Sequence, residues 1–535
     1  MTSRPLRVSR IAVPALFGAL LAARPVDAQP AGAPPAQPAD TADTDKELGP
    51  GKDAIKEKPD ALRTALAPQP GGLTFAMVAE EANKTSVAVR AKELELEASE
   101  GTVTQTTVAF FPRLQLNASY TRLSEIDNGS LGGGAIVGAG NEGLLRTGPC
   151  VDDPTQTCVV DSAGGPVAAS AFSFPSLLNQ ISFSANLTVP ISDYFLRAVQ
   201  AYNGAQHNTK SLEMAVQAQR LTVSADAKLV LLNWILAKGQ VVVTQQSVEQ
   251  SKAQLADAKA LRKAEKGSDA DVMRIEALVA QAELTEADAK SQEIVAEQRL
   301  RTTMHAPQNR PLAIGVDVFA DPAQPALPSD NDLFAEAIRS RLEILSAEEQ
   351  KKALEEVEST TAAGYFPRLD GFADAVVANP NQRIFPQQEQ FDFTWDVGVR
   401  LTWVVNDTFS TIGAAQQARA RTAQVDAQKQ QLIDSVRIEV TQARADVAKA
   451  APSIEAAKRG VTAAEEALRI NKLLFAVGSG TGTALADAEN AVTSARLRKL
   501  SAHVGLYAAL VRLEHATGRD RAPAALASNA MLEKN

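Results

Sequence analysis

The sequence has few aromatic residues, four histidines and two cysteines, and these shortages narrow the classes of protein it can belong to. Phe, Trp and Tyr make up 5% of the 535 residues. A chain of this length with several globular cores would need more of them, whereas its wealth of Ala, Gln, Glu and Lys is typical of long helices packed side by side. The net charge of -9 and the lack of a basic stripe give no support for a nucleic-acid partner.

Residues that would indicate catalysis are also missing. No phosphate-binding glycine loop and no Gly-x-Ser-x-Gly turn occurs in the sequence. The histidines show no metal-ligand spacing with one another; they are His207, His305, His503 and His515. We therefore expect neither an enzyme nor a bound cofactor or metal ion.

Long apolar runs are absent after the N-terminus. Residues 1–28 place arginines first, then an apolar run, then small residues, which is the order of a secretory signal peptide cleaved after Ala28. An N-terminal membrane anchor is the alternative, but the run from Ile11 to Ala23 is short for a span. Downstream, no stretch approaches about 18 uncharged apolar residues, so insertion into a membrane would have to use β-strands.

The two cysteines, Cys150 and Cys158, lie close together in a stretch rich in Gly, Pro, Asp and Thr. In an oxidised, exported protein they are a candidate disulfide that closes a small loop. Two free thiols or half of a metal site are the alternatives, and no histidine lies near them.

An internal duplication is the most informative feature of the chain. The motif Phe-Phe-Pro-Arg-Leu at 110–114 returns as Tyr-Phe-Pro-Arg-Leu at 365–369, a spacing of 255 residues. Later matches, such as Trp234 with Val447, have a spacing of 213. The first half therefore carries an insertion of about 40 residues relative to the second. That insertion contains both cysteines.

Four segments alternate between apolar and polar residues, as half-buried strands do. Two of them follow the Pro-Arg-Leu motifs, and the others are 180–189 and 391–403. Strands of about ten residues in an exported chain fit a transmembrane barrel. A soluble β-sandwich is the alternative, but the strands are isolated among helices. Because four strands cannot close a barrel, several chains would have to share one.

Two stretches of about 70 residues, 195–265 and 409–476, contain almost no helix breaker and predict helices roughly 100 Å long. Each ends in a turn where glycine, Gly267 in the first, is expected to cap the long helix. Ser, Asp or Thr is expected to begin the second helix, at 270–304 and 483–517. Shorter helices are predicted at 75–107 and 330–361. Gly239 and Pro452 occupy matched positions in the long helices, where we hypothesise a shared bend.

The predicted organisation is therefore two repeats with flanking segments. The first repeat, 73–305, contains a helix, two strands with a long loop, and a helical hairpin, and the second repeat is 330–517. Residues 306–329 are rich in proline and form the linker. Residues 29–72 are expected to be a disordered leader, and 518–535 a loose tail.

This order of elements resembles the TolC-type outer-membrane efflux protein family over about residues 73–517. The marks it shares are the duplicated aromatic-Pro-Arg-Leu motifs, the Leu-Thr strand ends, and the glycine-containing hairpin tips. The resemblance implies a homotrimer whose twelve strands form one outer-membrane β-barrel in contact with lipid. The barrel would continue into a long periplasmic α-helical barrel.

The resemblance also implies a function and partners. Such a protein is the passive outer-membrane exit duct of a tripartite efflux or type I secretion system. It docks on a periplasmic adaptor, which connects it to an inner-membrane transporter. The candidate adaptor contacts are the two tips, with Gly267 and Ser268 in the first and Gly478, Ser479, Gly480 and Thr481 in the second.

The family narrows its periplasmic entrance with acidic residues after the second tip. Glu489 matches one such position, but the earlier one holds Ala486, with Asp487 beside it. Asp487 and Glu489 are therefore the candidate gate, and an ordinary solvated helix face is the alternative. The first tip also departs from the family, since polar residues replace its usual apolar neighbours.

A periplasmic coiled-coil adaptor or structural protein without a pore is the alternative function. Long helical hairpins alone would support it equally well. The alternating strands decide against it, particularly 391–403 with Trp395 and Trp403, which could mark the lipid face or its boundary.

Overall fold

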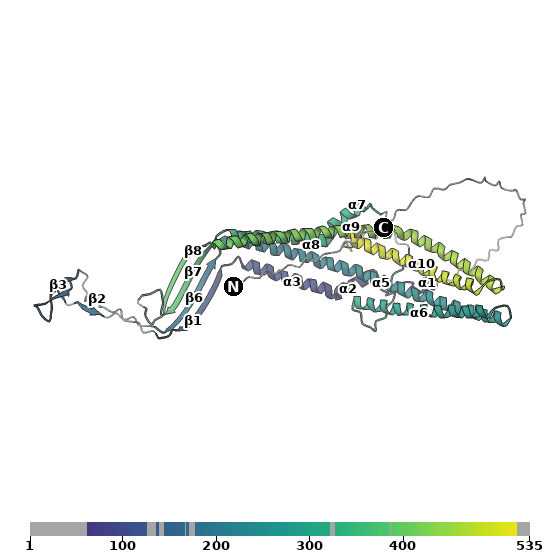
Figure 1. Cartoon of the computed structure of the whole chain (residues 1–535), viewed down its shortest axis with the longest axis horizontal. Helices are drawn as coiled ribbons and strands as arrows, with labels where there is room; N and C mark the ends of the chain where they lie inside the picture. The colour runs from purple at the N-terminus through teal and green to yellow at the C-terminus, as the bar shows by residue number, and fades with distance from the viewer. Residues whose placement is uncertain are drawn as a thin grey trace, which may run out of the picture. The chain divides into compact units, whose positions relative to one another are not determined.

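The computed structural model describes residues 61–125, 135–137, 144–165, 167–170, 177–320, 327–385 and 387–521. The predicted signal peptide, most of the predicted leader and nearly all of the predicted tail lie outside the described residues. The described part consists of long helices and an antiparallel sheet, and the order of its elements repeats once (Figure 1).

Four strands form one antiparallel sheet in the order β1-β6-β7-β8. They are β1 Arg113–Arg122, β6 Asn179–Val189, β7 Arg368–Asn379 and β8 Asp392–Thr402. The four strands predicted from alternation are thus confirmed. Figure 1 shows the two strands of the first repeat beside those of the second. β1 and β8 form the edges, and neither has a second partner strand in the described part of the chain.

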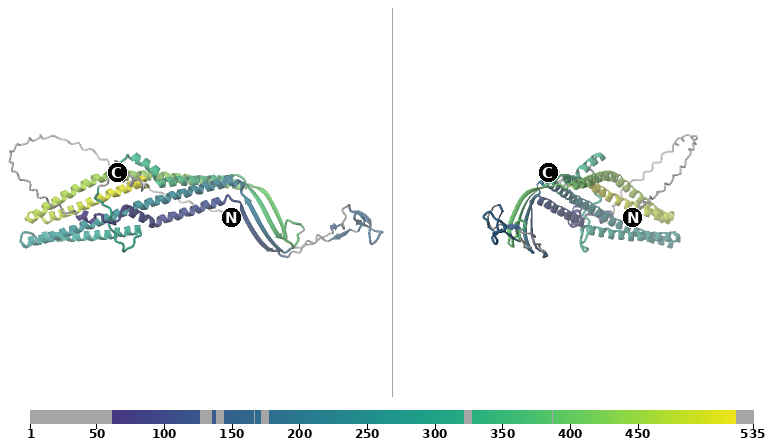
Figure 2. Two further views of the ribbon diagram at one scale, coloured as in Figure 1. Left: turned by 180° about the vertical axis from the view of Figure 1, so that it is seen from behind. Right: turned by 60° about the vertical axis from the view of Figure 1, so that its left-hand side comes forward.

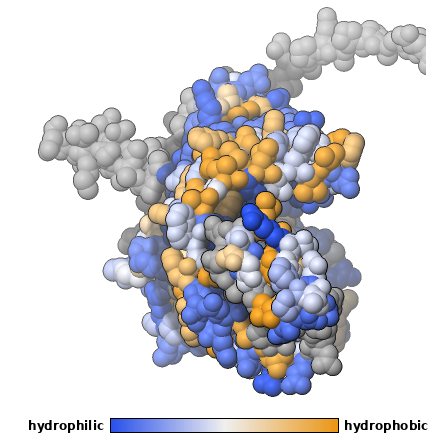
Figure 3. Space-filling model, turned by 90° about the vertical axis from the view of Figure 1, so that its left-hand side faces the viewer, coloured by the Kyte–Doolittle hydropathy of each residue, from blue (hydrophilic) through white to orange (hydrophobic). Residues whose placement is uncertain are grey.

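One face of this sheet is apolar and open to the surroundings. Leu116, Trp395 and Val399 are 73%, 68% and 72% exposed, and they lie on the same face. Figure 3, viewed from the side of the strands, shows hydrophobic residues at the surface among hydrophilic ones. No second sheet covers this face within the described residues, so the β-sandwich alternative is wrong.

The opposite face is polar, and it explains why β7 alternates weakly. Asn186 donates a hydrogen bond to Asp374 on this face at 2.7 Å. Phe372 shares the face, where it lies against Gly398 of the neighbouring strand and under the guanidinium of Arg400, 4.9 Å from the ring centre. A side chain at position 398 would meet the ring, so glycine makes room for an aromatic residue on the polar face.

The long loop between β1 and β6 contains two small hairpins that the sequence did not predict. β2 Ala135–Val137 pairs with β5 Ala168–Ser170, and β3 Arg146–Pro149 pairs with β4 Thr157–Val160. Cys150 and Cys158 form a disulfide at the end of the β3–β4 hairpin, with their Cα atoms 4.9 Å apart.

Two helical hairpins make up most of the described chain (Figure 2). The first joins α5 Val199–Lys263 to α6 Asp269–Met304, and the second joins α9 Val405–Ala476 to α10 Gly482–Thr517. α5 packs along both α6 and α10, and α10 packs along α9. Short turns lead into or out of the strands, namely α4 Ile191–Asp193, the π-helical turn Tyr194–Ala198 and the 3-10 turn Ala363–Tyr365.

The largest hydrophobic core surrounds the middle of α5. Trp234 and Ile235 are 1% and 0% exposed. By length and composition alone the helical stretch Ile191–Lys263 could cross a membrane, yet 56% of its most apolar window is buried inside the protein. Burial among other helices is what a core helix shows, and the apolar character of α5 is explained by this packing.

The structure gives different results for the bends hypothesised at Gly239 and Pro452. Both helices continue through these positions. Figures 1 and 2 show that α9 changes direction part-way along its length, and Pro452 removes one main-chain hydrogen bond inside it. Gly239 has a packing role, because a Cβ there would lie 2.6 Å from Leu500 and 3.0 Å from Leu66. A bend in α5 stays a prediction.

Each predicted helix before a first strand is in fact two helices. The first is divided into α2 Phe75–Thr85 and α3 Val87–Val108, and the second into α7 Asp330–Ser340 and α8 Leu342–Ala362. The breaks fall at Ser86 and Arg341, 255 residues apart, and both residues have φ -65° and ψ 118°. Extended backbone at one residue ends a helix, so the single-helix prediction was wrong.

A hydrogen bond connects each break to the end of a helical hairpin. The Thr85 hydroxyl donates to the Met304 carbonyl at 3.3 Å, and the Ser340 hydroxyl donates to the Thr517 carbonyl at 2.6 Å. These carbonyls belong to the last residues of α6 and α10, where no intrahelical donor remains. The duplication therefore extends to the contacts that hold the shorter helices on the hairpins.

Both ends of the described chain are more ordered than predicted. Helix α1 Ala61–Ala65 packs on α5, Leu62 and Leu66 are buried, and Leu73 pairs with Ile314 of the linker. At the other end, residues 519–521 form a 3-10 turn in which Arg519 binds Glu336 at 2.8 Å. The disorder expected for 61–72 and the looseness expected for 519–521 are therefore wrong, because apolar and ionic contacts hold both segments.

Candidate functional site

The loops that end the two hairpins share one backbone path. In the second tip, Gly478 has φ +80°, and the N–H groups of Ser479 and Gly480 both donate to the carbonyl of Leu474 at 2.9 Å. Both bonds satisfy one carbonyl group in the last turn of α9, as a left-handed glycine cap does.

In the first tip, the left-handed residue is Glu265, with φ +58°, 213 residues before Gly478. The N–H of Lys266 donates to the Leu261 carbonyl at 2.9 Å. Gly267, expected to supply the cap, instead lies close to α5, where a Cβ would be 3.3 Å from the main-chain nitrogen of Arg262. The expected cap was therefore assigned two residues too late.

Hydroxyl groups begin the returning helices, as predicted. Ser268 accepts a hydrogen bond from the N–H of Asp271 at 3.1 Å, and Thr481 accepts one from the N–H of Ala484 at 3.3 Å. These two N-cap residues, Ser268 and Thr481, also lie 213 residues apart. Each cap satisfies one of the free N–H groups at a helix start and fixes the direction in which the chain returns.

The two tips are joined to each other. Asp271 accepts a hydrogen bond from the main-chain N–H of Gly482 at 3.0 Å, and Arg274 contacts the hydroxyl of Thr483. Hydrogen bonding to the Ser268 hydroxyl and then to Gly482 lowers the pKa of Asp271 below its ordinary value. Since the anion is held at the start of α10, the helix dipole contributes to this contact.

The structure does not bring the two candidate gate carboxylates together. Asp487 is exposed, whereas the side chain of Glu489 is 1% exposed. Gln254 of α5 donates to Glu489 at 2.7 Å, and the ammonium of Lys472 lies 3.9 Å away. Burial raises the pKa of Glu489 above its ordinary value. Glu489 is therefore buried between the hairpins of this chain, and the structure does not place the two carboxylates on one exposed surface as expected.

Asp487 lines a shallow groove of about 750 Å³ between α9 and α10. The walls are mostly small residues, including Gly460 and Ala491, with Asn490 and Arg498 at polar positions. This arrangement leaves the Asp487 carboxylate accessible to solvent or to another chain. Within the described residues no group of three His, Cys, Asp or Glu side chains could hold a metal ion.

The sequence pattern of the family described as outer membrane efflux protein matches residues 78–304 and 333–519, which together exceed half of the chain. The chain belongs to the outer membrane efflux protein family. No curated protein sequence matches it significantly.

Solved structures support the fold of this efflux protein. CusC is 15% identical with a TM-score of 0.65, covering 83% of this chain and 92% of CusC. CmeC of Campylobacter jejuni is 13% identical with a TM-score of 0.64, covering 86% of this chain and 89% of CmeC. MtrE of Neisseria gonorrhoeae is 18% identical with a TM-score of 0.63, covering 83% and 88%.

Family membership gives the efflux protein its location and its class of function. It is an outer-membrane exit duct. Its family and fold are those of channels and not of enzymes. The alternative of a poreless periplasmic adaptor disagrees with this membership.

Proposed function

We propose that three copies of this chain form one duct that crosses the outer membrane. The observation that carries this proposal is a four-stranded sheet with two open edges and an exposed apolar face. Lipid cannot satisfy the hydrogen-bonding groups of a strand edge, so the edges must pair with other chains. Three copies give about twelve strands, which is above the minimum of about eight for a closed bacterial barrel.

The hairpin tips are the proposed contact with a periplasmic adaptor. Val477 is 74% exposed, and Gly267, Ser268, Gly478, Ser479, Gly480 and Thr481 lie in or next to the loops between the helices. The first tip adds an ion pair between Arg262 and Asp269 at 2.6 Å. An adaptor for this duct would therefore need polar groups opposite the first tip. Through the adaptor, an inner-membrane transporter would supply the substrate.

Asp487 is the proposed acidic residue of the periplasmic entrance. Its carboxylate is exposed near the tips, and three copies would present three negative charges to one passage. Such a ring favours cations over anions, so replacing Asp487 by Asn should reduce cation preference in planar bilayers. Asp434→Asn is the matched control, because Asp434 is exposed on α9 far from the tips.

The mass of the detergent-purified protein tests the assembly directly. Native mass spectrometry should give three chains, and planar bilayers should show stable conducting channels. A monomer that is stable in detergent and leaves bilayers silent would overturn the proposal. Unchanged ion selectivity in Asp487→Asn, with a trimer intact, would remove only the gate.

A further inference from the structure

A buried pair of polar side chains connects the two hairpins close to their tips. Gln254 of α5 and Glu489 of α10 are 4% and 1% exposed. The amide nitrogen of Gln254 donates to Oε2 of Glu489 at 2.7 Å. The apolar cluster around this level of the hairpins includes Ile275, Leu485 and Val492, so the pair is shielded from water.

The remaining oxygen of each side chain is left without a partner. Oε1 of Gln254 and Oε1 of Glu489 are both buried, and neither has a hydrogen-bond partner among the residues that the structure describes. If Glu489 is ionised, both atoms are acceptors only, and two unsatisfied acceptors inside a protein destabilise the folded state. A proton on Oε1 of Glu489 turns this oxygen into a donor.

A protonated carboxyl group and a primary amide are complementary. The amide N–H donates to one carboxyl oxygen, and the carboxyl O–H donates to the amide oxygen, which closes a ring of two hydrogen bonds. In the structure, the first of these bonds is already formed. The second requires the proton, and it would give a partner to both of the oxygens that now lack one.

The charged groups around the pair favour ionisation but do not replace the second bond. On α9, Lys472 lies 3.9 Å from Oε2 of Glu489, beyond direct hydrogen-bond distance, and its side chain is 42% exposed. On α10, Arg496 is engaged with Glu465 at 2.7 Å. On α5, Asp257 lines the pocket that Gln254 and Lys472 also line, and its negative charge opposes ionisation.

We propose that Glu489 carries a proton while the two hairpins are packed as in this structure, and that ionisation loosens α5 from α10 next to the tips. In the ionisation step the O–H bond of Glu489 breaks, the proton passes to water, and the carboxylate turns toward Lys472. The pair is a proton-dependent latch between the hairpins. Only its effect on conductance rests on the proposed duct.

The direction of the pH dependence follows from burial. Burial raises the pKa of Glu489 above 4.5, so the folded chain binds this proton more tightly than the unfolded chain. The contribution of the proton to stability is complete below pH 4.5 and is lost as pH rises through the raised pKa. The latch therefore holds below the raised pKa of Glu489 and releases as pH rises through it.

Infrared difference spectroscopy of the full-length protein during a pH titration tests the protonation. The wild type should lose a protonated-carboxyl C=O band as pH rises above 4.5. Glu489→Gln should lack this band, and Gln254→Leu should shift it to that of a carboxyl without an amide partner. Glu276→Gln is the matched control, since Glu276 holds the corresponding position on α6 but is exposed. A wild-type spectrum identical to that of Glu489→Gln would overturn the proposal.

Conductance in planar bilayers tests the consequence. Wild type and Glu276→Gln should become more conductive as pH rises through the interval in which the band disappears. Glu489→Gln should show no such rise, because two amides form the same ring at every pH. An equal rise in Glu489→Gln would overturn the latch. Silent bilayers for all variants would count against the duct, while the infrared result would still decide the protonation.

Discussion

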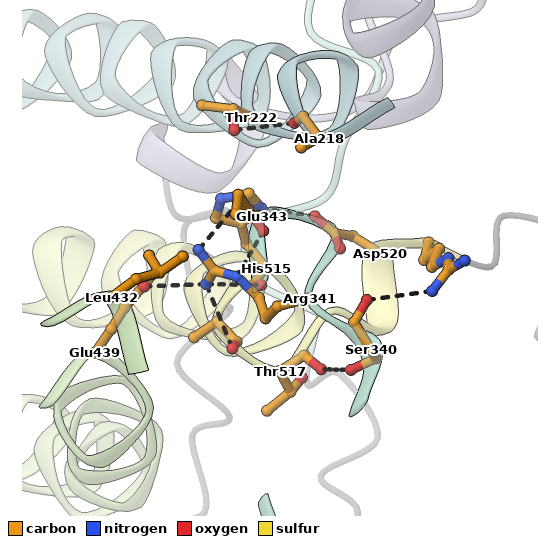
Figure 4. Close-up of polar contacts among 12 residues, drawn as sticks. Ala218, Thr222, Ser340, Arg341, Glu343, Leu432, Glu439, His515, Thr517 and Asp520 are labelled. Atoms are coloured by element: carbon orange, nitrogen blue, oxygen red, sulfur yellow. Dashed lines mark hydrogen bonds and ion pairs between the residues drawn. The ribbon is translucent and has the colours of Figure 1, made fainter. Parts of the chain in front are cut away.

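Replacing Arg341 by Ala is the most informative test of how the short helices are held on the hairpins. Its side chain is 9% exposed and lies at the break between α7 and α8 (Figure 4). The guanidinium donates to Glu439 at 3.0 Å, to Glu343 at 3.1 Å, and to the carbonyls of His515 and Ala516 at 3.4 Å each. It therefore caps the end of α10.

The expected loss is about 2–4 kcal/mol of unfolding free energy. Breaking a buried ion pair costs about 3–5 kcal/mol. Glu343 and Glu439 are 30% and 42% exposed, so water replaces part of what they lose, which lowers the figure. The hydrogen bonds from the guanidinium to the two carbonyls are long. Each therefore contributes to stability at the low end of the range for a hydrogen bond to a charged group, about 1.5–3 kcal/mol. The same truncation also removes packing at the break.

Urea unfolding in detergent, followed by the helical circular dichroism signal, measures this loss. Arg341→Lys should recover only part of the stability. The planar guanidinium of arginine reaches both carboxylates and the helix end at once, whereas the ammonium of lysine cannot. Arg339→Ala is the control, since Arg339 is exposed on the same helix and, among the described residues, donates its hydrogen bond within that helix, to the carbonyl of Ala335. A loss below about 0.5 kcal/mol, the usual range for surface substitutions, would refute the capping role.

Three further predictions concern single positions. Glu265→Gly should stabilise the protein by about 1 kcal/mol in urea unfolding, because Glu265 has a left-handed φ that a Cβ disfavours; a destabilised variant would refute this. Gly239→Ala should destabilise by about 1–2 kcal/mol through overpacking against Leu500, whereas Gly505→Ala, with open space around it, should not. Hydrogen bonding to Asp520 raises the pKa of His515 above 6.5, so its contribution is complete below pH 6.5 and is lost as pH rises through the raised value. Asp520→Asn should remove that pH dependence from thermal unfolding curves.

The strands and long helices were predictable because their signals are periodic and occur twice. Alternation over ten residues gave β1, β6, β7 and β8, and the lack of breakers gave α5 and α9. The breaks before α3 and α8 were not predictable in this way. Ser86 is a recognisable N-cap, but Arg341 has no helix-breaking character, and its contacts at the break include residues distant in the sequence.

The error at the candidate gate has a simpler cause. Asp487 and Glu489 are two residues apart on one helix, and at about 100° per residue their side chains point to nearly opposite sides. Helical spacing alone therefore argues against a shared opening for both. Which of the two is buried inside the protein depends on packing against α5. Nothing in the local sequence of α10 marks Gln254 as the hydrogen-bond partner of Glu489.

The two repeats reach the same backbone geometry with different side chains. Glu265 and Gly478 share the left-handed conformation, and Ser86 and Arg341 share the same φ and ψ at the helix breaks. Neither pair shares a residue type, so this backbone geometry does not depend on one particular side chain. The same reasoning explains how CusC, CmeC and MtrE keep this fold at 13–18% identity. At these four positions the backbone path is repeated while the residue type is not, so the duplication is clearer in the structure than in the sequence.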